Sequence, residues 1–484
     1  MLRRSRRLRR TAAALVAAAL LWVGTGASLI PGPETNPALA GSSSPNIVLI
    51  LTDDQRWDTL KDKYMPIVKS ELMAKGATFE NAFVVNALCC PSRVTILTGK
   101  YSHTHGVWTN ISPFGGYERF VRDGSTIATW LNHEGYVTSL VGKYLNQYKE
   151  PTDPGAYIPP GWDNWVVFTK EEGGDAEYFD YKLSVNGTIE RHPGTAAEDY
   201  STDVLAQHAD DLIRTAQSDR PLFLYFAPSA PHVPATPAPR HKQLFKGIQP
   251  WRPASYNERS IGDKPGYLRN VHRFSPKRRD QIDGTRRRQL ASLRAVDDAV
   301  GQILTALRDT GRLENTLIIF ASDNGYSWGE HRWVGKLVPY EESIRIPLVM
   351  RWDAEIDDGV TDTRMALNLD LARTIAHAAG VEAPETEGRS LLSMLNDPSA
   401  PGRERFLIEH LRSQLPPPSY CAVRTEHNLY VQYDTGEREL YNLRRDPHQL
   451  VNVARRRVNH ETVVSLKRAA RNLCRPRPPG MARF

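Results

Sequence analysis

Short runs of apolar, often β-branched residues recur along the chain, as they do in buried strands. The clearest runs cover 46–51, 137–141, 222–227, 316–321 and 346–350. Between some of them, apolar residues recur at helical spacing over 126–132, 289–308 and 370–379. Buried strands that alternate with amphipathic helices predict an α/β fold, with a large, mostly parallel sheet and helices on both faces.

Changes in composition divide the 484 residues into three predicted parts. Residues 1–40 form a leader and linker, 41–400 the main α/β domain, and 401–484 a smaller C-terminal subdomain of short alternating strands with a basic, helical tail. Asp, Pro and Gly residues cluster at 397–402, next to the second boundary. Within the main domain, 228–266 is rich in Pro, Arg and Lys without periodicity, which predicts a long loop region that shapes a site.

The first 40 residues have the pattern of an export signal. Six arginines precede an apolar run over 12–23, which is shorter than the roughly 20 residues that span a bilayer. Small residues follow, and cleavage is expected after Ala27 or Ala40. The pair Arg6-Arg7 resembles a twin-arginine signal. We expect an exported protein without a stable membrane span; the alternative is an uncleaved membrane anchor.

The basic leader accounts for most of the formal net charge of +7. Of the 62 basic residues, six lie in the first ten positions, and the remaining 56 face 55 acidic residues. A chain with nearly equal numbers of basic and acidic residues has no net positive charge that would attract a polyanion. We therefore expect no nucleic-acid partner.

Polar side chains follow three of the predicted strands. Asp53 and Asp54 come directly after the first run, Asp323 and Asn324 follow the fourth, and His232 lies beyond the third. In open α/β sheets, ligands bind beyond the carboxyl ends of the strands. Adjacent carboxylates repel each other unless a cation neutralises them, and oxygen-rich sites suit Ca²⁺ or Mg²⁺. The sequence therefore predicts a metal site here; the alternative is that the aspartates only turn the chain.

The four cysteines are too few for a disulfide scaffold. Cys421 and Cys474 both lie in the predicted C-terminal subdomain, and in an exported protein they either pair or stay free. Cys89 lies four residues before Arg93, so it is either a nucleophile with a depressed pKa or a buried structural thiol. Local chemistry leaves both interpretations open.

The segment around Cys89 resembles the sulfatase signature, Cys-x-Pro-Ser-Arg followed after three residues by Leu-Thr-Gly-Arg/Lys. Every fixed position is filled, by Cys89, Pro91, Ser92, Arg93, Leu97, Thr98, Gly99 and Lys100. The resemblance implies an alkaline-phosphatase-like α/β/α sandwich with a smaller C-terminal α+β subdomain. It also implies that Cys89, and not Cys90, is oxidised to formylglycine (3-oxoalanine) by a formylglycine-generating enzyme.

Further positions match motifs of that family. The resemblance implies the catalytic residues Cys89, Arg93, Lys100, Lys143, His232 and Lys336, and the metal ligands Asp53, Asp54, Cys89, Asp323 and Asn324. One position departs from the pattern, because many sulfatases have Gly-Lys-Trp-His where this chain has Leu145 in place of the histidine. The Lys-Tyr-Leu-Asn stretch from Lys143 resembles the N-acetylglucosamine-6-sulfatase branch. His103 and His105, in a motif of that branch, are expected to be structural.

The expected function is thus that of an exported sulfuric ester hydrolase. Its substrate would be a sulfated sugar such as N-acetylglucosamine 6-sulfate, or an aryl sulfate, and its cation Ca²⁺ or Mg²⁺. A hydroxyl of the hydrated aldehyde at position 89 would attack sulfur, and His232 or Lys336 would protonate the departing alcohol. Two alternatives stand beside this one: a phosphonate or phosphodiester hydrolase of the same superfamily, and a secreted sulfated-glycan binding protein without catalysis.

Overall fold

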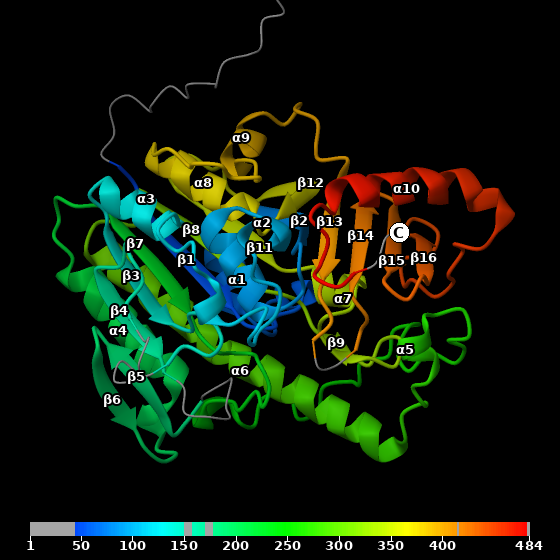
Figure 1. Cartoon of the computed structure of the whole chain (residues 1–484). Helices are drawn as coiled ribbons and strands as arrows, with labels where there is room; N and C mark the ends of the chain where they lie inside the picture. Colours follow the sequence, from blue (N-terminus) through cyan, green and yellow to red (C-terminus); the bar gives the residue numbers. More distant parts are fainter. Residues whose placement is uncertain (1–43, 150–156, 170–177, 414–415, 482–484) are drawn as a thin grey trace, which may run out of the picture. The chain divides into compact units, whose positions relative to one another are not determined.

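The apolar runs predicted as strands lie together in one ten-stranded sheet at the centre of the molecule (Figure 1). The computed structural model describes residues 44–149, 157–169, 178–413 and 416–481. The predicted leader and its cleavage points after Ala27 and Ala40 lie outside these residues. Among the described helices, none combines the length and the hydrophobicity needed to cross a membrane.

The large sheet has the strand order β12-β2-β11-β8-β1-β7-β3-β4-β5-β6. Its strands are β1 Asn46–Thr52, β2 Ala77–Phe83, β3 Val137–Gly142, β4 Asn164–Phe168, β5 Tyr181–Val185, β6 Thr188–His192, β7 Leu222–Ala227, β8 Thr316–Ser322, β11 Leu348–Arg351 and β12 Val360–Leu367. The five central strands, β8 to β4, are parallel, and only β11 and β5 among the described strands run against the rest. The expected mostly parallel sheet is confirmed, with β11 beginning after Pro347 rather than at residue 346.

Helices cover both faces of this sheet, which gives the expected α/β/α layers (Figure 1). The helices are α1 Cys89–Thr98, α2 Ser102–His105, α3 Ile127–His133, α4 Ser201–Thr215, α5 Gly266–Arg269, α6 Pro276–Asp309, α7 Glu341–Ile344, α8 Asp370–Ala379, α9 Leu391–Asn396 and α10 His460–Leu473. Alternate residues of β1 point to opposite faces of the sheet, so each face packs against a different layer of helices. Ile47 and Leu49 pack in one core with α1, α3 and α8, and Val48 and Ile50 pack in the other with α4 and α6.

Helix α6 begins thirteen residues before the predicted start at 289. The Ser275 hydroxyl accepts a hydrogen bond from the Arg278 amide at 3.3 Å, and Pro276 occupies the first helical position. The added turns are mostly charged, and Ile282 is their buried apolar residue. Hydrophobic periodicity therefore could not reveal them, although the capping residues could.

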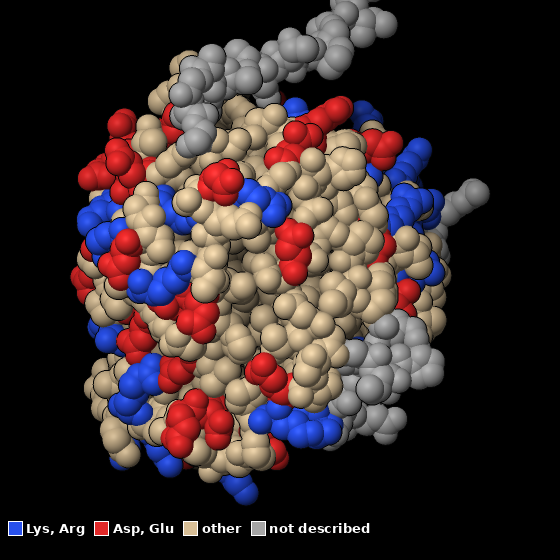
Figure 2. Space-filling view, turned by 90° about the vertical axis from the view of Figure 1, so that its left-hand side faces the viewer, with Lys and Arg blue, Asp and Glu red and all other residues tan. Residues whose placement is uncertain are grey.

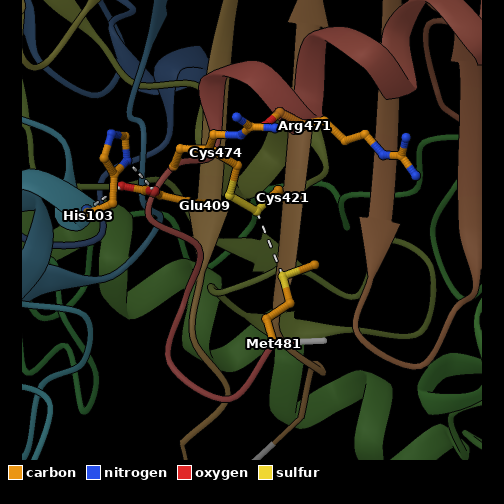
Figure 3. Close-up of a disulfide and its surroundings, with 7 residues drawn as sticks. His103, Glu409, Cys421, Arg471, Cys474 and Met481 are labelled. Atoms are coloured by element: carbon orange, nitrogen blue, oxygen red, sulfur yellow. Dashed lines mark hydrogen bonds and ion pairs between the residues drawn. A yellow bond between two sulfur atoms is a disulfide. The ribbon is translucent and has the colours of Figure 1, made fainter. Parts of the chain in front are cut away.

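A second, antiparallel sheet lies within the range predicted as the C-terminal subdomain. Its strands are β13 Arg405–His410, β14 Tyr420–Thr425, β15 Asn428–Tyr433 and β16 Arg438–Asn442, in that order. Helix α10 packs on it through a small core that includes Val423, Tyr430 and Leu466. A disulfide joins Cys421 of β14 to Cys474 at the end of α10 (Figure 3). Of the two alternatives for these cysteines, pairing is the one observed.

Charges are interspersed on the face of the molecule that Figure 2 shows. Acidic and basic side chains alternate around a broad area without charged residues. A mixed pattern of this kind produces no long-range field of one sign. This face therefore offers no broad positive surface for an anion.

Candidate active site

Three neighbouring strands end in polar residues at the same edge of the large sheet. β1 lies between β7 and β8, with Thr52 beside Ser322 in the parallel register. The Asp53 amide donates to the Ala230 carbonyl at 3.2 Å, and the Asp323 amide donates to the Thr52 carbonyl at 3.1 Å. The strand-end residues predicted from the sequence are therefore brought together by the sheet itself.

Cys89 enters this group from helix α1, of which it is the first residue. It is fully buried, with its sulfur 3.4 Å from Asp53 Oδ1 and 2.7 Å from Lys336 Nζ. Asn110 Oδ1 accepts a hydrogen bond from the Cys90 amide at 2.9 Å, which fixes the start of the helix. The helix thus directs its positive N-terminal end and the residue-89 side chain at the carboxylates.

Cations surround the carboxylates closely. Lys143 forms an ion pair with Asp53, and Lys336 Nζ lies 2.5 Å from Asp54 Oδ1. Arg93 Nε lies 2.8 Å from Asp323 Oδ2. His232 Nε2 lies 3.7 Å from Asp54 Oδ2, while its Nδ1 lies 2.7 Å from the Val233 carbonyl oxygen. All these side chains are buried or nearly so, which makes their mutual attraction stronger than it would be in water.

The cations determine the charge of the central carboxylate. Burial alone would raise the pKa of Asp53, but Lys143, His232, Lys336 and Arg93 together hold it well below its usual range. The pKa values of Lys143 and Lys336 are raised by the same carboxylates despite burial. Asp53 is therefore ionised, and both lysines are charged.

The Cys89 thiol has a raised pKa. Burial is the main cause, and the neighbouring negative charge of Asp53 adds to it. The interpretation of Cys89 as a nucleophile with a depressed pKa is therefore wrong. As an unmodified thiol, this residue is protonated and a poor nucleophile at neutral pH.

The donor set fits a hard divalent cation. Ligand atoms of Asp53, Asp54, Cys89 and His232 lie within 4.8 Å of one another. Asp54 Oδ2 and Asn324 Oδ1 are buried without a hydrogen-bond partner, and such oxygens normally have one. Ca²⁺ and Mg²⁺ prefer oxygen ligands, which the aspartates and the asparagine supply and a thiol does not. An oxygen-bearing side chain at position 89 would complete the set better than cysteine does.

Lys100 is one predicted site residue that the structure does not bring to this cluster. Its Nζ lies 3.0 Å from Glu385 Oε2, in a half-exposed pair. Cys89 begins α1 and Lys100 lies beyond its last residue, so the ten-residue helix separates them by about 15 Å. A match of spacing in sequence therefore did not imply a place in the site.

The two histidines of the following segment have structural contacts, as expected. His103 Nδ1 lies 2.8 Å from Glu409 Oε2, and the His103 backbone amide donates to the other oxygen of that carboxylate at 3.0 Å (Figure 3). His105 Nε2 lies 3.1 Å from the Thr95 hydroxyl. The first pair links α2 to β13 of the second sheet.

Sequence reasoning missed the buried Arg56, which ties the two carboxylate-bearing loops together. Its Nη1 donates to the Tyr326 carbonyl at 3.1 Å and to Glu330 Oε1 at 2.8 Å. Its guanidinium also lies 4.4 Å from the Trp328 ring centroid. The nearness of Arg56 to Asp54 in the sequence was the only available signal, and it does not reveal partners 270 residues away.

The fold is that of an α/β protein, and its site combines two kinds of buried group. Carboxylates of the kind that bind divalent cations lie beside lysine and arginine side chains, whose charge suits an anionic ester. The sulfatase family model matches residues 45–381, and the model of the C-terminal region of N-sulphoglucosamine sulphohydrolase matches 329–475. The chain therefore belongs to the sulfatase family and is a sulfuric ester hydrolase.

Curated relatives extend the similarity over most of the chain. Human N-acetylglucosamine-6-sulfatase is 32% identical over 462 residues, which cover 86% of this chain and 82% of the relative. A putative extracellular sulfatase Sulf-1 homolog of Caenorhabditis elegans is 35% identical over 359 residues, or 73% of this chain. This chain spans only 49% of that second relative.

Solved structures share the fold. A protein solved in complex with its substrate D-glucosamine-2-N,6-O-disulfate superimposes with a TM-score of 0.76 and 24% identity, over 89% of this chain and 97% of the other. The phosphonate monoester hydrolase of Agrobacterium radiobacter gives a TM-score of 0.71 and 20% identity, over 89% of this chain and 95% of the other. At these identities the likeness concerns the fold alone.

Proposed function

We propose that this sulfatase is exported and removes sulfate from a sulfated sugar such as N-acetylglucosamine 6-sulfate. The names of the relatives that match most of the chain support this substrate class, and so does the Lys-Tyr-Leu-Asn stretch from Lys143. The observation that carries the proposal is the place of Cys89, at the start of α1 and in contact with Asp53 and Lys336.

The reaction would use formylglycine at position 89, made from Cys89 by a formylglycine-generating enzyme. Its hydrate would supply an oxygen nucleophile for sulfur and a second hydroxyl for releasing the sulfate. A Ca²⁺ or Mg²⁺ ion held by Asp53, Asp54, Asp323, Asn324 and residue 89 would polarise the sulfate oxygens and lower the pKa of the attacking hydroxyl. The unsatisfied oxygens of Asp54 and Asn324 support this ligand set.

The protein's own cations would bind and orient the ester. Lys143 and Lys336 carry charge into the centre and would stabilise the negative charge that develops on the sulfate oxygens. Arg93 is held by Asp323 and by the Lys143 carbonyl at 2.9 Å, so it would help to fix residue 89 and the carboxylates. The leaving alcohol needs a proton, and His232 would donate it from Nε2. The Nδ1–H group of the same ring would keep its hydrogen bond to the Val233 carbonyl oxygen.

Mass spectrometry of the tryptic peptide 76–93, from protein made in its natural host, tests the first requirement. We expect the mass of an aldehyde side chain at residue 89 and an unchanged Cys90. A peptide with two intact thiols would contradict the proposed chemistry and would favour a binding protein.

Activity of two neighbouring cysteine variants tests the second requirement. Replacing Cys89 by Ala should lower kcat/KM for sulfate esters by roughly 10⁴-fold or more, as the loss of a nucleophile does. Cys90→Ala removes an equally buried thiol one residue along and is the matched control. Rates on phosphate diesters and phosphonates are measured in parallel, and a higher kcat/KM on those esters would support the alternative hydrolase.

Export is supported by the disulfide between Cys421 and Cys474, because such bonds form and persist in oxidising compartments. The basic and apolar pattern of the leader points the same way, with a twin-arginine route proposed from Arg6 and Arg7. N-terminal sequencing of protein collected outside the cells should find a start after Ala27 or Ala40. Protein retained in the membrane with an intact leader would indicate an anchor.

A further inference from the structure

Lys336 reaches the centre of the site from a stretch of chain that is neither helix nor strand. Residues 336–340 lie between the two-residue strand β10 Val334–Gly335 and helix α7. The Lys336 amine is nevertheless placed closely, 2.5 Å from Asp54 Oδ1 and 2.7 Å from the Cys89 sulfur. Irregular segments hold a side chain less precisely than helices and strands do, so this backbone needs support from its neighbours.

The residue after Lys336 has a strained backbone that two neighbours fix. Leu337 has a φ of +82°, in the left-handed region that a leucine rarely adopts. Such a conformation persists where the surrounding structure enforces it. The Leu337 amide donates to the Ala87 carbonyl at 3.2 Å, and the Leu337 carbonyl accepts from the Tyr420 hydroxyl at 2.8 Å. The segment before α1 and strand β14 of the second sheet thus hold Leu337 together.

The second sheet also holds the residues that follow. Glu439 of β16 accepts a hydrogen bond from the Tyr340 hydroxyl at 2.8 Å, and Arg424 of β14 lies 2.8 Å from Glu341. All four side chains are buried, and α7 lies beside β14 (Figure 1). Three residues of this sheet therefore anchor the stretch 337–341.

Lys143, the other lysine of the site, is supported by different elements. It follows β3 directly, and its amide donates to the Ala227 carbonyl at the end of β7 at 2.7 Å. Its carbonyl accepts from Arg93 of α1 at 2.9 Å. These contacts come from the large sheet and its helix layer, so Lys143 serves as an internal comparison for Lys336.

We propose that Tyr420 is a positioning residue for the reaction: its hydroxyl fixes the Leu337 carbonyl and thereby places the Lys336 amine against Asp54 and residue 89. Glu439 contributes to the same placement through Tyr340. This inference rests on the proposed function, in which Lys336 stabilises the charge that develops on the sulfate. It gives the C-terminal sheet a part in catalysis, because a displacement of about 1 Å at a reacting centre can cost 10²-fold in rate.

The test compares kcat and KM for a sulfate ester in single and double variants. Y420F removes one hydroxyl and should lower kcat about tenfold with KM changed less than about twofold, because the displaced amine stabilises the transition state less. In the K336M background, adding Y420F should change kcat less than about twofold, since the amine through which Tyr420 acts is gone. In the K143M background, adding Y420F should again cost about tenfold.

Y430F is the matched control. Tyr430 is as buried as Tyr420 and lies on the neighbouring strand β15, but its hydroxyl donates to Gln432 Oε1 at 2.9 Å. Its kcat should equal that of the wild type. Y340F removes the hydroxyl that reaches Glu439 and should lower kcat in the same way as Y420F, so it provides the test if Y420F does not fold. Thermal unfolding shows which variants are folded.

An unchanged kcat in both Y420F and Y340F, beside a loss in K336M, would overturn the inference alone. A loss from Y420F that persists undiminished in the K336M background would also overturn it, because the effect would not pass through Lys336. Crystal structures of the wild type and Y420F give a readout without turnover: the Lys336 amine should move away from Asp54, and an unmoved amine would contradict the inference. Absence of sulfate ester hydrolysis by the wild type would instead refute the proposed function.

Discussion

Asp53 is in contact with Lys143, Arg93 and the Cys89 sulfur, and its neighbour Asp54 contacts Lys336 and Asn324. Each contact is buried, so the loss of one partner leaves an uncompensated charge with no water to solvate it. The cations of the site therefore hold the carboxylates in place as well as offering charge to an anionic ester.

Comparing Lys336→Met with Lys100→Met tests whether a lysine inside the site contributes to the reaction while one that only matches the family motif in sequence does not. Removing a charge that stabilises the transition state should lower kcat by about 10²–10³-fold. Lys100→Met makes the same change beyond the far end of α1 and should alter kcat less than about twofold, because Lys100 pairs with Glu385 away from the centre. Steady-state kinetics on a sulfate ester provide the measurement, and equal losses in the two variants would contradict the placement of Lys100.

Strand-end residues were the predictable part of the site. Asp53, Asp323 and His232 follow apolar runs, and any parallel sheet brings such positions to one edge. Lys100 and Arg56 were not predictable in the same way. The place of Lys100 depends on where α1 ends, and that of Arg56 on a partner supplied by a distant loop.

At the scale of elements, apolar periodicity predicted the buried strands and the amphipathic parts of helices. It failed where an element is stabilised by other means, as in the polar first turns of α6, which Ser275 and Pro276 start. It also could not show which elements meet. The contact of α2 with β13, for example, includes the bonds that the ring and the backbone amide of His103 make to Glu409.

The ion pair between His103 and Glu409 makes part of the stability depend on pH. Burial would lower the pKa of His103, but the hydrogen bond and the charge of Glu409 outweigh it and raise the pKa above its usual value. A raised pKa in the folded state means that the contribution is fully present below about pH 6.5 and is lost as the pH rises through the folded-state pKa. His103→Gln should therefore cost more at pH 5.5 than at pH 8.5, by about 1 kcal/mol in the free energy of unfolding.

Denaturant unfolding of the wild type and the variant at the two pH values measures this difference. His133→Gln, at an exposed position on α3, makes the same change of side chain away from this pair and is the control for the substitution itself. A cost for His103→Gln that is the same at both pH values would mean that the pair contributes through packing and not through charge.

At the scale of the whole molecule, the site is assembled from residues that lie far apart in the chain. Asp53 and Asp323 are 270 positions apart, yet their strands are neighbours in the sheet. A cation bound between them would therefore link distant parts of the fold. Because it would bind the folded chain and not the unfolded one, it would stabilise the molecule by mass action.

Removal and return of the cation should be visible in thermal unfolding. At a concentration of 100 times its Kd, the ion should add about 2.7 kcal/mol to the free energy of unfolding. Protein treated with a chelator should thus unfold at a lower temperature and recover with Ca²⁺ or Mg²⁺, whichever the site prefers. Asp54→Ala is expected to lose this response, and a response that persists in the variant would place the ion elsewhere.

The burial of Cys89 bears on whether a modification of this residue can follow folding or must precede it. Its side chain has no exposed surface, and segments as distant as Lys336 close over it. A modifying enzyme cannot reach a sulfur enclosed in this way. If Cys89 is converted as proposed, the conversion would have to precede folding, and a molecule that folds with an intact thiol would lack the proposed nucleophile however much of it accumulates.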